Sequence, residues 1–297
     1  MKILLFGKNG QVGNAILPYL KKIGDVIALD YRDSNYDANF LYPELLRSTI
    51  NKIKPDIIVN AVAYTSVDKA ENNYQHAELI NSQSVLVLAQ ESQKIGALFI
   101  HYSTDYIFNG TGDQPWTELS EPSPINLYGK TKLLGEEFIK ENCLSYLIFR
   151  TSWVYSSKGH NFLNTMISLG KQKEELSVVY DQIGTPTSAE LIASYSYLAI
   201  QQTINDLSFT GTYNLVADGE TSWYGFAEKI FSYIKKIDPN IILKNIHPIP
   251  SSQYKLPAER PKNSRLSIQK FQTTFNTKLP SWDIDVIKTI NEIYKNH

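Results

Sequence analysis

The stretch ILLFGKNGQVG at residues 3–13 decides the fold. A short apolar run is followed directly by Gly7, Gly10 and Gly13, and then by residues with helical periodicity. Glycines at such a junction let the backbone turn tightly and approach a pyrophosphate, while the first helical turn offers unpaired N–H groups and a positive dipole end. The spacing is G-x-x-G-x-x-G rather than the G-x-G-x-x-G of simple dehydrogenases. A glycine loop between a strand and a helix still predicts a dinucleotide site.

Outward from this loop, the first half of the chain alternates short apolar runs with amphipathic segments. The runs are rich in Ile, Val and Leu and are bounded by Gly, Pro or polar residues, which is typical of buried strands. The predicted strands are Ile3–Phe6, Val26–Leu29, Ile57–Asn60, Leu98–Tyr102 and Tyr146–Phe149. The predicted helices between them are Val12–Lys22, Pro43–Ile53, Gln75–Ile95 and Leu127–Glu141. Strands separated by helices indicate an α/β fold, a Rossmann-type doubly wound parallel sheet with helices on both faces.

After about residue 150 this rhythm loosens, and Tyr, Pro and Ser become frequent. Helical patterns persist at Asn161–Gly170, Ala189–Ile204, Trp223–Lys235 and Asp283–Tyr294. We therefore expect two domains without a low-complexity linker. Residues 1–150 form an NAD(P)-binding Rossmann domain, and residues 151–297 form mainly a smaller mixed α/β substrate-binding domain, with parts that return to the Rossmann domain.

The composition excludes several classes of function. A net charge of −1 over 297 residues gives no electrostatic case for nucleic acid or an anionic membrane. The apolar run after Lys2 is too short for a signal peptide, and no stretch approaches the roughly 20 apolar residues that span a bilayer. The single Cys143 excludes an internal disulfide. We expect a soluble, cytoplasmic protein.

Two residues near the end of the second strand bear on the choice of cofactor. Asp30 lies about 20 residues beyond the glycine loop, where a carboxylate would hold the adenosine ribose hydroxyls. A carboxylate there repels a 2′-phosphate and favours NADH. Arg32 could instead pair with that phosphate and admit NADPH. Both NADH and NADPH stay open.

The pair Tyr128 and Lys132 stands at i and i+4 on one face of a predicted helix. A free phenol has a pKa near about 10, and a cation one turn away favours the phenolate and brings this pKa toward the neutral range. The same ammonium can hydrogen-bond the nicotinamide ribose. Thr104 lies at the carboxyl end of the preceding strand, where ligands of open α/β sheets bind, and its hydroxyl can hydrogen-bond a substrate carbonyl. These three residues predict an oxidoreductase of the short-chain type.

The sequence resembles the extended short-chain dehydrogenase/reductases, and within them the dTDP-4-dehydrorhamnose reductase family. The likeness runs essentially end to end and includes the blocks TSVDKAE (65–71), HYSTDY (101–106), RTSWVY (150–155), DQIGTPT (181–187) and RPKNS (260–264). The last three blocks are the more specific ones, because they belong to the substrate side. The resemblance implies that a dTDP-linked deoxy-keto-sugar, dTDP-4-dehydro-β-L-rhamnose, is reduced at its 4-keto group with NADH or NADPH, the last step of dTDP-L-rhamnose biosynthesis.

The resemblance also assigns residues to the two ligands. It implies a cofactor site formed by Gly7, Gly10, Gln11, Val12, Gly13, Asp30, Asn39, Phe40, Ala63, Tyr64, Thr65, Tyr102, Tyr128 and Lys132. It implies a substrate site formed by Thr104, Asp105, Trp153 and Arg260, with Tyr128 as the proton donor. From the residues alone, Trp153 could belong to the core, Asp105 could cap a turn, and Arg260 could be a solvated charge. The chain departs from the family at Asn39, where an acidic residue is usual, and at Tyr64, where a histidine is usual.

Magnesium is a further question, because some family members are reported to hold it with glutamates between subunits. Glu190 and Glu292 occupy candidate positions, but Ala15 stands at a third, so no metal site is predicted and a surface salt bridge is the expected role of both glutamates. Magnesium and a homodimer stay open. Two alternative functions also stay open: another nucleotide-sugar reductase or epimerase on the same fold, and a noncatalytic regulatory subunit resembling that of methionine adenosyltransferase.

Overall fold

The computed structural model describes residues 1–295, so residues 296 and 297 of the predicted second domain lie outside the described part. Six parallel strands form the central sheet, in the order β10-β5-β4-β3-β1-β2. They are β1 (Lys2–Phe6), β2 (Asp25–Leu29), β3 (Ile57–Asn60), β4 (Leu98–Thr104), β5 (Tyr146–Thr151) and β10 (Gly211–Asn214). The predicted Rossmann-type parallel sheet is confirmed, and each predicted strand is present within two residues of its expected ends.

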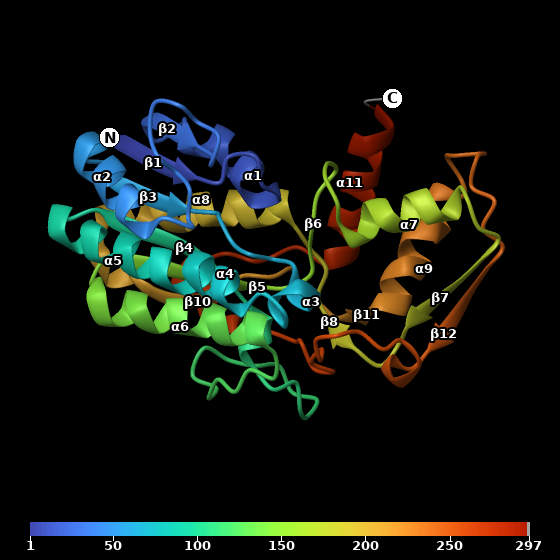
Figure 1. The fold of residues 1–297 in the computed structure, drawn as a ribbon. Coiled ribbons are helices and arrows are strands. Elements are labelled where there is room, and N and C mark those ends of the chain that lie inside the picture. The colour runs from blue at the N-terminus through green and yellow to red at the C-terminus, as the bar shows by residue number, and fades with distance from the viewer. Residues whose placement is uncertain (296–297) are drawn as a thin grey trace.

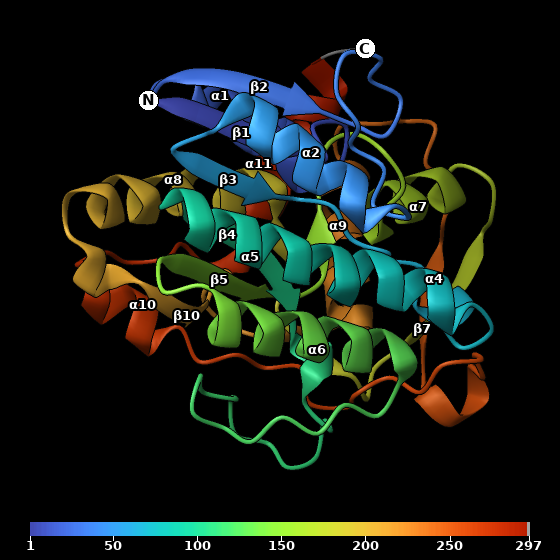
Figure 2. The same cartoon turned by 60° about the vertical axis from the view of Figure 1, so that its left-hand side comes forward.

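Helices cover both faces of this sheet. Two of them pack together on one face, α1 (Gln11–Leu20) and α8 (Ala189–Asn205). The other face carries α2 (Pro43–Ile53), α5 (Ser84–Ile95) and α6 (Leu127–Asn142), which lie side by side in Figure 2.

The alternation of side chains along β1 explains why both faces need a cover. Ile3 and Leu5 point into the core beneath α1 and α8, whereas Leu4 and Phe6 point into the core beneath α2 and α5. All four side chains are fully buried. A parallel strand with apolar residues at every position can be buried only between two helical layers.

The second half of the chain forms a smaller body beside the sheet (Figure 1). Its core lies between α7 (Phe162–Gly170), α9 (Trp223–Ile234), α11 (Trp282–Lys295) and a parallel pair of strands, β7 (Glu175–Val179) and β12 (Asn245–Ile249). Shorter strands connect the two bodies: β6 (Val154–Tyr155), β8 (Ile183–Gly184), β9 (Thr187–Ser188) and β11 (Thr221–Ser222). Three elements from beyond residue 150 nevertheless pack with the central sheet: α8, β10 and α10 (Gln269–Thr274).

The predicted continuous helix 75–95 is wrong in one respect. It is divided into α4 (Tyr74–Glu78), a π-helical turn η1 (Leu79–Gln83) and α5. The turn carries Asn81, whose side-chain oxygen accepts from the Tyr64 backbone N–H at 2.8 Å and whose amide nitrogen donates to the Thr131 hydroxyl at 3.1 Å. These bonds connect the loop after β3 to α6, and π-turns of this kind are frequent at functional sites.

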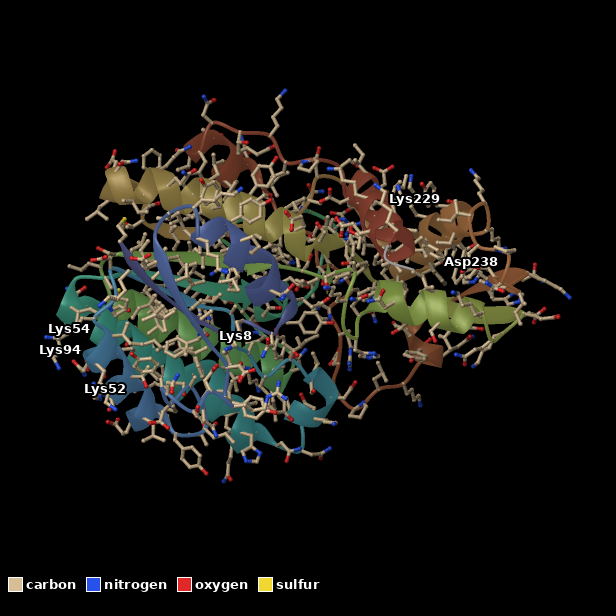
Figure 3. The ribbon with its side chains drawn as sticks, turned by 90° about the horizontal axis from the view of Figure 1, so that it is seen from above. Lys8, Lys52, Lys54, Lys94, Lys229 and Asp238 are labelled. Carbon is tan, nitrogen blue, oxygen red and sulfur yellow. The ribbon has the colours of Figure 1, made fainter. Side chains whose placement is uncertain are left out.

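The order of the strands reverses between β1 and β3, and ligands of open α/β sheets bind beyond the carboxyl ends of strands at such a point. Figure 3 shows Lys8 of the glycine loop near the middle of the molecule, between the sheet and the second half. Lys52, Lys54 and Lys94, at the C-terminal ends of α2 and α5, lie at the far end. Within residues 1–295 no helix is both long and apolar enough to cross a bilayer.

Candidate functional site

The glycine loop is shaped by close contact between backbones. Gly7 has a φ of +87°, and a Cβ there would lie 2.9 Å from the carbonyl carbon and oxygen of Ala61 in the loop after β3. Gly10 precedes α1 without a side-chain cap, so the first N–H groups of this helix lack a capping side chain. This junction has the features of an anion site at a helix N-terminus.

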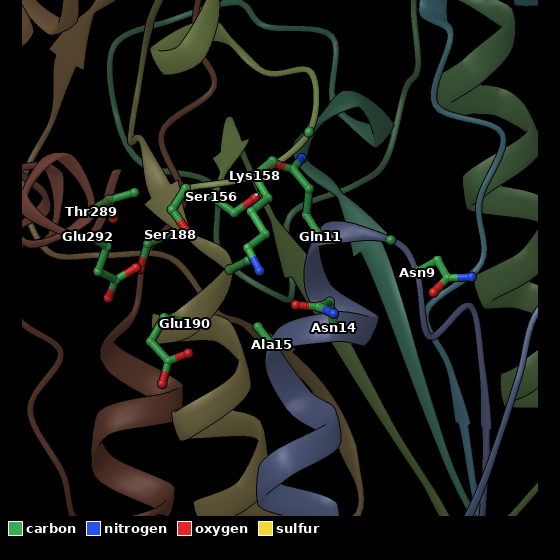
Figure 4. Close-up of a pocket in the computed structure, with 14 residues that line it drawn as sticks. Asn9, Gln11, Asn14, Ala15, Ser156, Lys158, Ser188, Glu190, Thr289 and Glu292 are labelled. Carbon is green, nitrogen blue, oxygen red and sulfur yellow. Dashed lines mark hydrogen bonds between the residues drawn. The ribbon is translucent and has the colours of Figure 1, made fainter. Parts of the chain in front are cut away.

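Gln11 connects the glycine loop to the second half of the chain. Its side-chain oxygen accepts from the Ser156 hydroxyl at 2.8 Å and from the Asn161 amide at 3.0 Å. Figure 4 shows Gln11 and Ser156 beside the same pocket, with Lys158 next to them. These bonds occupy the side-chain oxygen of Gln11. Its backbone N–H, in the first turn of α1, would then be the group that donates to a phosphate. Val12 and Gly13 follow within the first turn of α1.

The end of β2 places opposite charges next to each other. Asp30 Oδ1 accepts from the Arg32 backbone N–H at 2.7 Å, and the Arg32 guanidinium lies 3.4 Å from Asp30 Oδ2. The Asn9 amide also donates to Asp30. The backbone N–H of Arg32 lowers the pKa of Asp30, and the Arg32 side chain is 67% exposed. The Asp30 carboxylate, which suits a ribose diol, and the Arg32 guanidinium, which suits a 2′-phosphate, therefore lie next to each other at the end of β2.

Asn39 and Phe40, which were expected to flank the adenine, have structural roles. The Asn39 side-chain oxygen accepts from the Leu41 backbone N–H at 3.0 Å. The Phe40 ring is buried and packs edge-on against Phe6, with 5.5 Å between the ring centroids. The Phe40 ring is therefore a core group.

The loop at Ala63, Tyr64 and Thr65 runs from β3 to the short helix α3 (Val67–Ala70). The Asn81 side chain accepts from the Tyr64 N–H and donates to the Tyr64 carbonyl at 3.2 Å. One side chain therefore fixes both backbone polar groups of Tyr64 in this loop. The sequence analysis missed Asn81. Asn81 stands next to Ser82, Gln83 and Ser84, so no pattern in the sequence distinguished it.

Tyr128 lies in the first turn of α6, which Asn126 caps by accepting from the Gly129 N–H at 2.8 Å. A Cβ on Gly129 would lie 2.1 Å from the Tyr106 carbonyl oxygen, so the glycine lets this turn approach the end of β4. The Tyr128 ring meets Tyr106 edge-on, with centroids 5.8 Å apart. Burial raises the pKa of Tyr128 to about 12, and the Thr104 hydroxyl opposes this rise.

Lys132 is fully buried one turn further along α6. Its Nζ donates to the Tyr102 carbonyl oxygen at 2.6 Å and lies 3.1 Å from Nε2 of His101. Burial lowers the pKa of Lys132 to about 8. The expectation that Lys132 brings the pKa of Tyr128 toward neutrality is wrong for this structure, because burial of the phenol dominates and the lysine nitrogen is directed at Tyr102 and His101.

Asp105 lies next to Thr104 and is buried. Its Oδ1 accepts from the Thr104 hydroxyl at 3.1 Å, while within residues 1–295 no hydrogen-bond partner reaches its Oδ2. Burial raises the pKa of Asp105 to about 7, and the hydroxyls of Ser264 and Thr104 partly oppose this rise. A buried carboxylate oxygen without a partner is costly and suits a ligand hydroxyl.

Trp153 has a φ of +48°, which is uncommon for a large side chain. Its indole stacks on Trp223, with ring centroids 3.7 Å apart, and Gly184 lies against the indole. The Trp223 ring nitrogen donates to the Gln182 side-chain oxygen at 3.2 Å. Neither Trp223 nor Gly184 was among the predicted site residues, although Trp223 begins a predicted helix and Gly184 lies in the block DQIGTPT.

Arg260 is not a solvated charge, since its side chain is only 15% exposed. Its guanidinium donates to both carboxylate oxygens of Asp68, at 2.5 Å and 2.7 Å. It also lines a cleft of about 710 Å³ in the second half, together with Tyr106 and Trp223. The other walls are mainly apolar and include residues of α7 and β7.

The metal candidates meet in a different pocket. Glu190, Glu292 and Ala15 line the pocket of Figure 4, and the Tyr19 hydroxyl donates to Glu190. In the part of the chain that the structure describes, no group of three or more His, Cys, Asp or Glu side chains could hold a metal ion. Magnesium takes six oxygen ligands. Glu190 and Glu292 supply two carboxylates to this pocket, and Ala15 supplies none.

The chain is similar to known proteins along its whole length. The family model described as the RmlD substrate binding domain matches residues 1–295. A dTDP-4-dehydrorhamnose reductase from Escherichia coli (strain K12) is 46% identical over 294 residues, which cover 99% of this chain and 98% of that protein. The structure of a dTDP-4-dehydrorhamnose reductase from Clostridium acetobutylicum has a TM-score of 0.89 and 36% identity, covering 99% of this chain and 100% of that one. A dTDP-4-dehydrorhamnose reductase from Bacillus anthracis in complex with NADP has a TM-score of 0.87 and 34% identity, covering 98% and 99%.

Proposed function

The chain belongs to the RmlD substrate binding domain family of dTDP-4-dehydrorhamnose reductases, and on this premise we propose that it reduces the 4-keto group of dTDP-4-dehydro-β-L-rhamnose to give dTDP-β-L-rhamnose. The observation that carries the proposal is the meeting of Tyr128, Thr104 and Lys132 at the carboxyl end of β4, which is separated from the strand-order reversal only by β3. A binding-only protein has no chemical need for this set.

The cofactor residues come from the carboxyl ends of neighbouring strands. The α1 N-terminus at Gly10 and Gln11 suits the pyrophosphate, Asp30 and Arg32 suit the adenosine ribose, and the loop at Tyr64 suits the nicotinamide. The bound nicotinamide supplies the hydride. Because Asp30 and Arg32 are paired, a 2′-phosphate would compete with the Asp30 carboxylate for the exposed guanidinium, and we propose that NADPH and NADH are both accepted.

The proton comes from this chain. Tyr128 is buried with a pKa raised to about 12, so it is protonated at neutral pH and can donate to the developing alkoxide. Thr104 stands beside it to donate a hydrogen bond to the same oxygen. Lys132, four residues further along the same face of α6, would donate to the ribose hydroxyls.

Both halves of the chain supply substrate contacts. Asp105 offers its unpartnered Oδ2 to a sugar hydroxyl, and the indole of Trp153 offers an apolar surface for the deoxysugar. The apolar cleft that Arg260 and Tyr106 line would take the nucleotide, with the guanidinium next to the diphosphate. Figure 1 shows this half beside the carboxyl ends of the sheet strands.

The test follows both the cofactor and the product. The keto sugar linked to dTDP or UDP is incubated with NADH or NADPH, and the product is identified by NMR. We expect stoichiometric oxidation of the cofactor and a 4-hydroxyl product. An epimerised sugar without net cofactor consumption would refute the reductase. Tyr128→Phe should lower turnover by about 10²–10⁴-fold and leave cofactor affinity within about twofold, because only the donated proton is lost.

A further inference from the structure

Two buried polar side chains, Asn60 and His101, extend in a row behind the catalytic lysine. The Nδ2 amide of Asn60, at the end of β3, lies 3.1 Å from Nδ1 of His101 in β4, and Nε2 of His101 lies 3.1 Å from Nζ of Lys132. All three residues are at most 1% exposed. The proposed mechanism gives no role to Asn60 or to His101.

The backbone decides how the Asn60 amide is oriented. The N–H of Val62 points at one end of this amide, 3.0 Å from it, and an N–H can only donate. That end must therefore be the oxygen, so the nitrogen Nδ2 faces His101 and donates to Nδ1. A neutral imidazole that accepts at Nδ1 carries its proton on Nε2.

The tautomer in turn decides the charge of the lysine. An Nε2–H that faces Lys132 must donate, and an ammonium has no lone pair to accept this hydrogen bond. An uncharged amine accepts from Nε2–H and still donates to the Tyr102 carbonyl at 2.6 Å. We propose that Asn60 and His101 form a tautomer lock, which holds Lys132 as an uncharged amine in the cofactor-free chain.

The surroundings of Lys132 agree with this assignment. Glu136, one turn along α6, favours the ammonium, but its carboxylate is held by the Arg150 guanidinium of β5 at 2.7 Å. Burial lowers the pKa of His101 well below its ordinary value, so the imidazole is neutral.

The tautomer lock makes cofactor binding a proton-linked step. This part rests on the proposed function, in which Lys132 donates to the ribose hydroxyls. Lys132 then gains acceptors that favour its cation, so binding takes up a proton at pH values where the free lysine is an amine. The sign follows from linkage: the pKa of Lys132 is low before binding and higher after it, so affinity falls as pH rises above about 8, by up to about tenfold per pH unit.

The first experiment needs no cofactor. Long-range ¹H–¹⁵N NMR of the histidine rings, with His101→Gln used for assignment, identifies which nitrogen of His101 carries the proton. We expect the proton on Nε2 at pH values above about 8, where the free lysine is an amine. A proton on Nδ1, or a doubly protonated ring, would overturn the lock. This result does not depend on whether the chain turns over a sugar, so it separates failure of the lock from failure of the proposed function.

The second experiment measures proton uptake by titrating NADP⁺ calorimetrically at about pH 9 in buffers of different ionisation enthalpy. We expect close to one proton per site. Asn60→Asp replaces the amide donor with an acceptor and lets Nδ1 carry the proton, and His101→Gln gives the lysine an oxygen acceptor. Both variants should take up less than about half of the wild-type proton, because Lys132 is already a cation.

The matched control is Ser82→Ala. It removes a buried hydrogen bond of 2.8 Å to the carbonyl of Thr131, the residue before Lys132, and leaves the tautomer lock intact. Its proton uptake should equal that of the wild type. Binding by the wild type without proton uptake would refute the proposal, as would an equal loss of uptake in Ser82→Ala and His101→Gln.

Discussion

Replacing Asp105 by asparagine should change how the stability of this protein depends on pH. The carboxyl is buried and its pKa is raised to about 7 from an ordinary value of 3.8. Above the ordinary pKa the unfolded chain releases this proton while the folded chain keeps it. The folded state is therefore favoured at low pH, and its advantage is lost as pH rises from about 4 to about 7.

The magnitude follows from the two pKa values. A tenfold change in proton affinity corresponds to about 1.4 kcal/mol, so ionised Asp105 costs the fold about 4 kcal/mol at pH values above 7. Roughly 3 kcal/mol of this cost develops between about pH 5 and about pH 8. In Asp105→Asn the amide oxygen can still accept from Thr104, while its NH₂ group lacks a partner, which costs about 1–3 kcal/mol at every pH.

The assay is urea unfolding of the wild type and of Asp105→Asn at about pH 5 and about pH 8. The variant should gain about 3 kcal/mol relative to the wild type between these two pH values. Asp113→Asn removes an exposed carboxylate and serves as the control, with the pH dependence of the wild type. If Asp105→Asn and the wild type lose stability in parallel, the carboxyl is not held protonated by burial and the reasoning fails.

Three further outcomes are expected. Gly184→Ala places a methyl group 2.8 Å from the Trp153 indole, so steady-state kinetics should show the KM for the sugar nucleotide rising about tenfold, with the cofactor affinity unchanged; an unaltered KM would exclude Trp153 from the substrate site. Glu136→Gln leaves the buried Arg150 guanidinium without its counter-charge and should lower the free energy of unfolding in urea by about 3–5 kcal/mol, whereas a loss below about 1 kcal/mol would show that the ion pair is dispensable. Treatment with a chelator should leave the rate unchanged, and a rate restored only by added magnesium would contradict our interpretation of the pocket carboxylates.

The sequence predicted what depends on periodicity and on short-range spacing. The strands β1 to β5 were predictable because each is an apolar run with polar or glycine boundaries, and the glycine loop was predictable because it follows the first of them. β10 was not predicted, since Gly-Thr-Tyr-Asn carries no apolar run and is a strand only because it pairs with β5.

The candidate site was predictable only where one segment carries it. Tyr128 and Lys132 belong to one helix, so their spacing in the sequence was enough to predict that they lie close together. Asn60, Asn81 and His101 were missed because each is a single buried polar residue with a side-chain partner 17 or more positions away in the chain. Their roles come from tertiary hydrogen bonds, which leave no pattern along the sequence.

β10 stands about 60 residues after β5 in the sequence, and this separation has a consequence for how the protein folds during synthesis. During synthesis on the ribosome, residues 1–150 emerge first, but the strand that pairs with β5 and the helix α8 that covers β1 follow some 40 to 65 residues later. Until then the edge of β5 and an apolar face of the sheet stay open to other chains, which is a recognised route to aggregation. We therefore expect a fragment ending near residue 150 to be insoluble, and one extending past Phe275 to be the shortest that can close the sheet and its core.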